Sequence, residues 1–147
     1  MDEKYMKEAL KEAKKSLLSD DVPVGAVIVL NNKIISRGHN MKEKNNDPTQ
    51  HAEIIAIKKA TKKLNDWYLN DCIMYVTMEP CLMCAGALIQ SHIKKLVYGI
   101  KNDKFGYVDS IDNILNNKQN NHIVEIKGNI LANESRILIQ NFFKTKR

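Results

Sequence analysis

Apolar residues recur at intervals of three and four positions in several parts of this chain, and this spacing predicts amphipathic helices. Near the N-terminus they alternate with Lys and Glu and predict a helix over residues 2–18. The same spacing predicts a helix from about His51 to Leu64 and a last one over Leu131–Phe143. A further helix is expected from Cys81 to about Ser91, because Pro80 suits a helix entry, where its missing N–H costs nothing.

Short runs of β-branched and apolar residues predict five strands, at Gly25–Leu30, Lys33–Arg37, Cys72–Thr77, Leu96–Ile100 and His122–Lys127. The first two are expected to form a hairpin, since Asn31 and Asn32 provide a turn between them. Residues 39–50 are expected to form a polar loop, Ile111–Leu115 a short helix and Asn116–Asn121 a loop. Strands that alternate with helices predict a three-layer α/β fold.

The length of 147 residues predicts a single domain, residues 1–147, and neither a repeat nor a long linker interrupts it. No apolar run approaches a membrane span, and the polar N-terminus is unlike a signal peptide, so we expect a cytoplasmic protein without membrane contact. The formal charge of +6 favours a polyanionic partner, although an AT-rich genome also produces many lysines. Cys72 is expected to be a small buried residue.

Two short motifs supply the residues of a catalytic zinc site, His51-Ala52-Glu53 and Pro80-Cys81-Leu82-Met83-Cys84. One imidazole and two thiolates are typical zinc ligands, and three protein ligands leave the fourth tetrahedral position open for water. Glu53 lies two residues from His51, where it can move protons for that water instead of binding the metal. The pattern is typical of zinc-dependent nucleobase deaminases, which remove an amine from an aromatic base by hydrolysis.

Both motifs fall where helices are expected to begin, and the positive end of a helix stabilises thiolates. A structural zinc site is one alternative, but it needs a fourth protein ligand, and the other candidates lack a matching spacing: His39, Cys72, His92 and His122. A deaminase-like binding protein without catalysis is another alternative. Such a protein typically lacks the glutamate or a ligand, whereas this chain has all four residues.

Four longer segments carry a resemblance to a known family: Val22–Val27, Gly38–Asn40, Asp47–Ile54 and, above all, Thr77–Ala87. They make the chain similar, almost from end to end, to the TadA-type tRNA-specific adenosine deaminases of the cytidine and deoxycytidylate deaminase superfamily. Members convert the wobble adenosine (position 34) of a tRNA anticodon to inosine. The resemblance implies a three-layer α/β/α fold like that of cytidine deaminase, a mixed sheet of about five strands, and a homodimer.

For the site, the resemblance assigns one Zn²⁺ per subunit to His51, Cys81 and Cys84. It makes Glu53 the proton shuttle during attack of zinc-activated hydroxide on adenine C6. It also implies that nine residues contact the tRNA anticodon stem-loop: Val22, Pro23, Asn40, Ala52, Lys101, Lys104, Phe143, Lys144 and Arg147. By their residue types alone, Asn40 is a turn residue and Val22 and Pro23 pack a strand entry. One of the two adjacent phenylalanines, Phe142 and Phe143, is expected to lie in the core.

The chain departs from the bacterial pattern over Lys101–Ser110, where Asn102 replaces the usual acidic residue. This Asn-x-Lys-Phe-Gly run is closer to the catalytic subunit of the eukaryotic heterodimeric enzyme. The competing interpretation is a free-base, nucleoside or nucleotide deaminase of the same fold, acting on guanine or cytosine. The basic C-terminus and the length of the Thr77–Ala87 match count against that interpretation.

Overall fold

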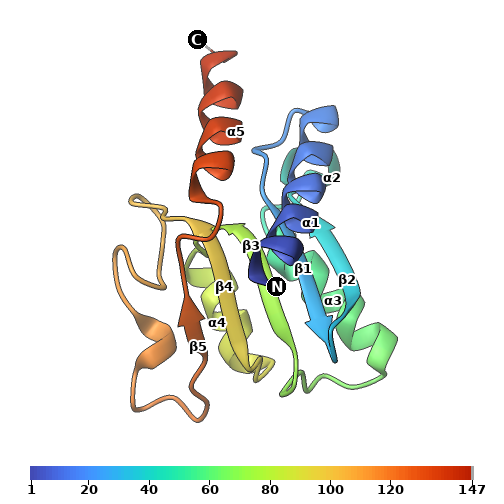
Figure 1. Ribbon diagram of the computed structural model, residues 1–147, viewed down its shortest axis with the longest axis vertical. Coiled ribbons are helices and arrows are strands. Elements are labelled where there is room, and N and C mark those ends of the chain that lie inside the picture. Colours follow the sequence, from blue (N-terminus) through green and yellow to red (C-terminus); the bar gives the residue numbers. More distant parts are fainter. Residues whose placement is uncertain (147) are drawn as a thin grey trace.

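A five-stranded mixed sheet forms the middle of the computed structural model, which describes residues 1–146 (Figure 1). Its strands lie in the order β2-β1-β3-β4-β5 and span β1 Gly25–Leu30, β2 Lys33–His39, β3 Ile73–Met78, β4 Lys95–Ile100 and β5 Glu125–Lys127. Strand β1 pairs antiparallel with β2 and β3, whereas β4 pairs parallel with β3 and β5. The expected hairpin and the mixed sheet of five strands are both confirmed.

Helices cover both faces of the sheet, which confirms the three-layer architecture. On one face lie α1 (Asp2–Lys15) and α5 (Ala132–Lys144), side by side in Figure 1, where α5 extends beyond the upper end of the strands. On the other lie α3 (Ala52–Leu64) and α4 (Leu82–Gln90). Helix α3 packs closely against Gly38 of β2, where an added Cβ would lie only 2.4 Å from the carbonyl oxygen of Ala52.

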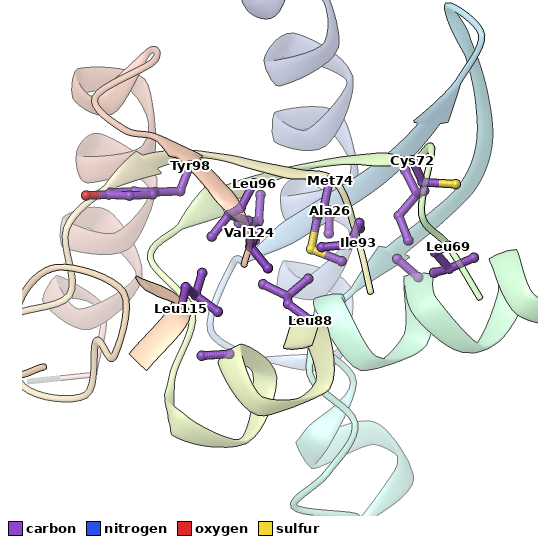
Figure 2. Packing of buried hydrophobic residues seen from close by; sticks show 14 of the residues in the cluster. Ala26, Leu69, Cys72, Met74, Leu88, Ile93, Leu96, Tyr98, Leu115 and Val124 are labelled. Carbon is purple, nitrogen blue, oxygen red and sulfur yellow. The ribbon is translucent and has the colours of Figure 1, made fainter. Parts of the chain in front are cut away.

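The central strands are buried on both faces, as their apolar runs predict. In β1, Ala26 and Ile28 pack towards α3 and α4, whereas Val27 and Val29 pack beneath α1. Figure 2 shows the larger cluster, in which Leu88 of α4 meets the strand residues Met74 and Leu96 and Val124, which precedes β5. Cys72 is 1% exposed within it, and burial raises the pKa of its thiol to about 11, which confirms the expected role as a small buried residue.

Several element boundaries differ from the expected ones. The first helix ends at Lys15 and continues as a 3₁₀ turn, η1 (Ser16–Ser19), and β2 extends to His39 because His39 still pairs with Gly25 of β1. The expected polar loop over residues 39–50 contains a one-turn helix, α2 (Lys42–Asn45). A residue distant in the sequence stabilises this helix, because the carboxylate of Asp21 accepts hydrogen bonds from the backbone of Glu43 and Lys44.

The stretch after β4 is less regular than expected. The short helix predicted at Ile111–Leu115 is a 3₁₀ turn, η2 (Ile114–Asn116), and the last strand covers only Glu125–Lys127. His122 does not extend that strand, because its ring stacks on His92 and bonds to the carbonyl oxygen of Ile93. Within residues 1–146, none of the helices has the length and apolar character to cross a membrane.

Candidate metal centre and active-site cleft

The metal motifs lie at the first residues of two helices, as the sequence predicts. His51 is the N-cap of α3 and Cys81 the N-cap of α4, and Cys84 follows in the first turn of α4. Strand β3 leads directly into the second motif, through Met78 and Glu79. Helix N-termini carry unpaired N–H groups and positive partial charge, which favour a thiolate at this end of α4.

The three ligand atoms lie at the separations that a tetrahedral metal requires. Nδ1 of His51 is 3.6 Å from Sγ of Cys81 and 3.5 Å from Sγ of Cys84, and all three atoms lie within 4.8 Å of one another. With zinc bonds of about 2.3 Å to sulfur and about 2.0 Å to nitrogen, a tetrahedral angle would place a sulfur and a nitrogen ligand about 3.5 Å apart. His51, Cys81 and Cys84 are therefore positioned to hold a metal ion, and among residues 1–146 this group contains no fourth ligand.

The pKa values of the two cysteines differ, and this difference suits metal binding. The thiol of Cys84 and the ring of His51 lower the pKa of Cys81 to about 4, against the effect of burial. The Cys81 sulfur and burial raise the pKa of Cys84 above its ordinary value, and the Cys81 sulfur also raises that of His51. Cys81 is thus the thiolate of the pair, and a cation held by these residues would displace the proton of Cys84.

Glu53 lies in the first turn of α3 and is 4% exposed. Its carboxylate is not part of the ligand group, although it lines the same cleft as His51 and Cys81. Burial raises the pKa of Glu53 to about 7. A buried carboxyl group that is not a metal ligand, next to an open metal position, has the placement of a general acid and base.

A cleft of about 1170 Å³ leads to these residues. Five of the nine predicted substrate-binding residues line it: Val22, Asn40, Ala52, Lys104 and Phe143. Three do not line it: Pro23, which is buried, and Lys101 and Lys144, which are exposed outside it. Arg147 lies outside the described residues. The expected division of the phenylalanines is confirmed, because Phe142 is buried and Phe143 is exposed.

Asn40 has a local structural role in addition to its place in the cleft. Its side-chain amide donates to the carbonyl oxygen of Val22 at 3.2 Å, and its Oδ1 accepts from the backbone N–H of Lys42 at 3.1 Å. The side chain therefore connects the segment before β1 to the start of α2. Asn40 is thus a turn residue, as its residue type predicts, and it also lines the cleft.

Comparisons with known proteins agree with this geometry. A model of the MafB19-like deaminase family matches residues 1–147. A tRNA-specific adenosine deaminase of Aquifex aeolicus (strain VF5) is 45% identical over 99% of this chain and 95% of its own length. A solved structure from studies of A-to-I editing by tRNA:A34 deaminases has a TM-score of 0.88 and 36% identity, covering 92% of this chain and 98% of that one. This chain belongs to the tRNA-specific adenosine deaminase family.

A second solved structure shows how far the likeness extends to enzymes of other substrates. The guanine deaminase from Bacillus subtilis is 40% identical to this deaminase, with a TM-score of 0.64, over 67% of this chain and 64% of that one. The two structures share the deaminase fold, while the alignment leaves a third of each chain unmatched. The regions outside the metal motifs are therefore the place to look for substrate preference.

The structure of the deaminase adds a residue that sequence reasoning missed, Glu79. Its carboxylate is 2% exposed and accepts hydrogen bonds from the backbone N–H groups of Asn102, Val108, Asp109 and Ser110 and from the hydroxyl of Ser110. Burial alone would raise the pKa of Glu79, but these donors lower it below its ordinary value. In the sequence Glu79 is part of the family motif, and nothing local indicates that its partners lie 23 to 31 positions away.

Proposed function

We propose that this chain hydrolyses the wobble adenosine (position 34) of a tRNA anticodon to inosine, with one Zn²⁺ per subunit. The observation that carries the proposal is the three-ligand group of His51, Cys81 and Cys84 with Glu53 buried beside it in one cleft. Near-full-length similarity to tRNA-specific adenosine deaminases supports adenosine in tRNA as the substrate. The net reaction adds water at adenine C6 and releases ammonia.

The chain's own residues have distinct tasks in this reaction. Zinc, when bound by His51, Cys81 and Cys84, supplies a Lewis acid that brings the pKa of water down to about 7. Glu53 takes a proton from the attacking water and passes it to a ring nitrogen of adenine. It then takes the proton of the new C6 hydroxyl group and delivers it to the amine, which leaves as ammonia as the C6 carbonyl forms. Val22 and Ala52, which line the cleft, exclude water from one side of the base.

Basic and aromatic residues around the cleft support RNA as the partner. Lys42, Lys104 and Lys146 line it together with Phe143, and the chain carries a formal charge of +6. A single-stranded loop is held by phosphate contacts and by stacking of its bases on aromatic rings. Lys101 and Lys144, exposed outside the cleft, extend this basic surface in the proposal.

We further propose a single deaminase domain over residues 1–147, a homodimer and a cytoplasmic location. The span of the family match supports the single domain. The family resemblance supports the homodimer, and light scattering of the purified protein tests it: a mass of two chains is expected. A location beside the cell's tRNA follows from the proposed substrate.

A free-purine deaminase is the second candidate, favoured by the 40% identity to a guanine deaminase over part of the chain. The curated relatives that are 42–45% identical over nearly the whole chain are tRNA-specific adenosine deaminases. The cleft also includes three residues of the C-terminal helix α5: Ile139, Phe142 and Phe143. These two observations favour RNA over a free base.

One experiment separates the two candidates. The purified zinc-loaded protein is incubated with an anticodon stem-loop carrying adenosine at the wobble position and, separately, with free adenosine, guanine and cytidine. Inosine in the RNA, without turnover of the small substrates, is the expected result. Turnover of a free base without inosine in the RNA would overturn the proposal.

A further inference from the structure

The loop that departs from the bacterial pattern presents an aromatic ring at the cleft. Phe105 is 64% exposed, and it lines the cleft with its neighbour Lys104. Among the exposed large apolar side chains of residues 1–146, only Phe105 and Phe143 line this cleft. Because the ring is exposed, it contributes little burial free energy to folding and is free to contact a ligand in the cleft.

The backbone of Phe105 is tied to the active site through two hydrogen bonds in series. The N–H of Phe105 donates to Oδ1 of Asn102 at 3.2 Å, and the N–H of Asn102 donates to Oε1 of Glu79 at 3.1 Å. Glu79 stands two residues before the metal-site residue Cys81. The backbone that carries the exposed ring is therefore held in place before any ligand arrives, which lowers the entropy cost of binding.

The tie continues on the other side of Phe105. The N–H of Gly106 donates to the carbonyl oxygen of Asn102 at 2.8 Å, and that of Tyr107 to the carbonyl oxygen of Pro80 at 3.0 Å. A Cβ at residue 106 would lie 2.4 Å from Cδ of Glu79, so this close approach requires glycine. The loop is thus packed against the residues that lead into α4, with the ring of Phe105 left outside.

We infer that Phe105 is a base-stacking residue, whose ring receives the face of an RNA base next to the target adenosine. Every base has a flat apolar face, and an exposed aromatic ring beside a lysine matches a base with its phosphate. Lys104 supplies that charge at the adjacent position. The inference rests on the proposed function and adds a specific contact to it.

The test is a double-mutant cycle between the side chain and the RNA. Phe105→Ala and Phe105→Tyr are compared with the unchanged chain on anticodon stem-loops that are intact or lack the base on one or the other side of the target. Stacking of one base on an aromatic ring contributes enough for Phe105→Ala to lower kcat/KM about 5- to 150-fold, mainly through KM. Phe105→Tyr is expected to retain most of the activity.

The RNA side of the cycle identifies the partner base. Removing the base that stacks on Phe105 is expected to lower kcat/KM of the unchanged chain by a similar factor and to leave Phe105→Ala no worse. Trp67→Ala is the matched control, because Trp67 is 63% exposed and does not line the cleft. It is expected to leave KM unchanged.

Three results would overturn the inference: an equal effect of Phe105→Ala on all three RNAs, an equal loss in Trp67→Ala, or a loss that follows a change in oligomeric state. The last result would mean that a second copy of the chain covers the ring. If the unchanged chain forms no inosine in the intact stem-loop, the proposed function itself fails, and this is seen before any variant is compared.

Discussion

Two buried glutamates in the same cleft, Glu53 and Glu79, differ in what surrounds them. They are 4% and 2% exposed, so both carboxyl groups have lost most of their hydration. Burial raises the pKa of Glu53 to about 7. At Glu79 burial acts in the same direction, but N–H and O–H donors of Asp109, Ser110 and Asn102 outweigh it and lower the pKa.

The difference shows how one cleft uses the same residue type for structure and for chemistry. A carboxylate surrounded by donors stays an anion, and the segment that provides the donors is held against it. A buried carboxyl group whose pKa is near 7 gains and loses a proton easily, which catalysis of proton transfer requires. Glu79 therefore organises the loop over residues 102–110, whereas Glu53 has the pKa that the proposed proton shuttle requires.

Replacing Glu79 should have the largest effect on stability. Glu79→Gln places an amide NH₂ against backbone N–H donors and leaves several of them without an acceptor, so the free energy of unfolding should fall by about 2–4 kcal/mol. Urea unfolding of the metal-loaded protein measures this loss. A change below about 0.5 kcal/mol would show that the contacts of Glu79 contribute little net stability.

Replacing Gly106 tests the same loop from the other side. In Gly106→Ala the new Cβ would lie 2.4 Å from Cδ of Glu79, and such overpacking costs about 1–3 kcal/mol. Gly86 in α4 is the matched control, because a Cβ there meets nothing within 4 Å, and Gly86→Ala should raise stability by about 0.5–1 kcal/mol. Thermal unfolding of both variants measures the contrast. Equal effects of the two would contradict the close packing at Glu79.

The smallest effect concerns a carboxylate that has donors but lies near the surface. The carboxylate of Asp2 accepts hydrogen bonds from Lys127 at 2.7 Å and from Tyr75 at 2.9 Å. Lys127 first and then Tyr75 lower the pKa of Asp2, although burial alone would raise it. A lowered folded-state pKa stabilises the fold above the unfolded pKa of about 4, and this contribution disappears as the pH falls through the folded value.

Asp2→Asn should therefore cost about 0.5–1 kcal/mol at pH 7 and almost nothing at pH 3. Unfolding of both proteins at the two pH values gives the comparison. A loss that is as large at pH 3 as at pH 7 would show that the ionised carboxylate of Asp2 is not its source.

The parts of the molecule that the sequence predicts well depend on neighbouring residues. Local patterns predict where α3 and α4 begin, at His51 and Cys81. They also predict the hairpin of β1 and β2 and the buried central strands. The ligand spacing in the two motifs also predicts the group that the structure brings together.

The parts that could not be predicted depend on contacts between distant residues. Asp21 stabilises α2 by accepting hydrogen bonds from the backbone of Glu43 and Lys44, which follow it by 22 and 23 positions in the sequence. Glu79 fixes the path of the loop over residues 102–110, which has no regular pattern of apolar residues. The exposed position of Phe105 follows from that path. The resemblance assigns substrate contacts to Pro23, Lys101 and Lys144, which do not line the cleft, and these contacts stay a prediction.

The central claim is that His51, Cys81 and Cys84 hold the metal while Glu53 moves protons without binding it. Glu53→Gln tests it, with zinc content and inosine formation measured on the same sample and His51→Ala as the control that should lose both. The account predicts that Glu53→Gln keeps as much zinc as the unchanged chain, unfolds no more easily, and loses about 10²- to 10⁴-fold in kcat. Loss of zinc from Glu53→Gln, or turnover within about tenfold of the unchanged chain, would contradict it.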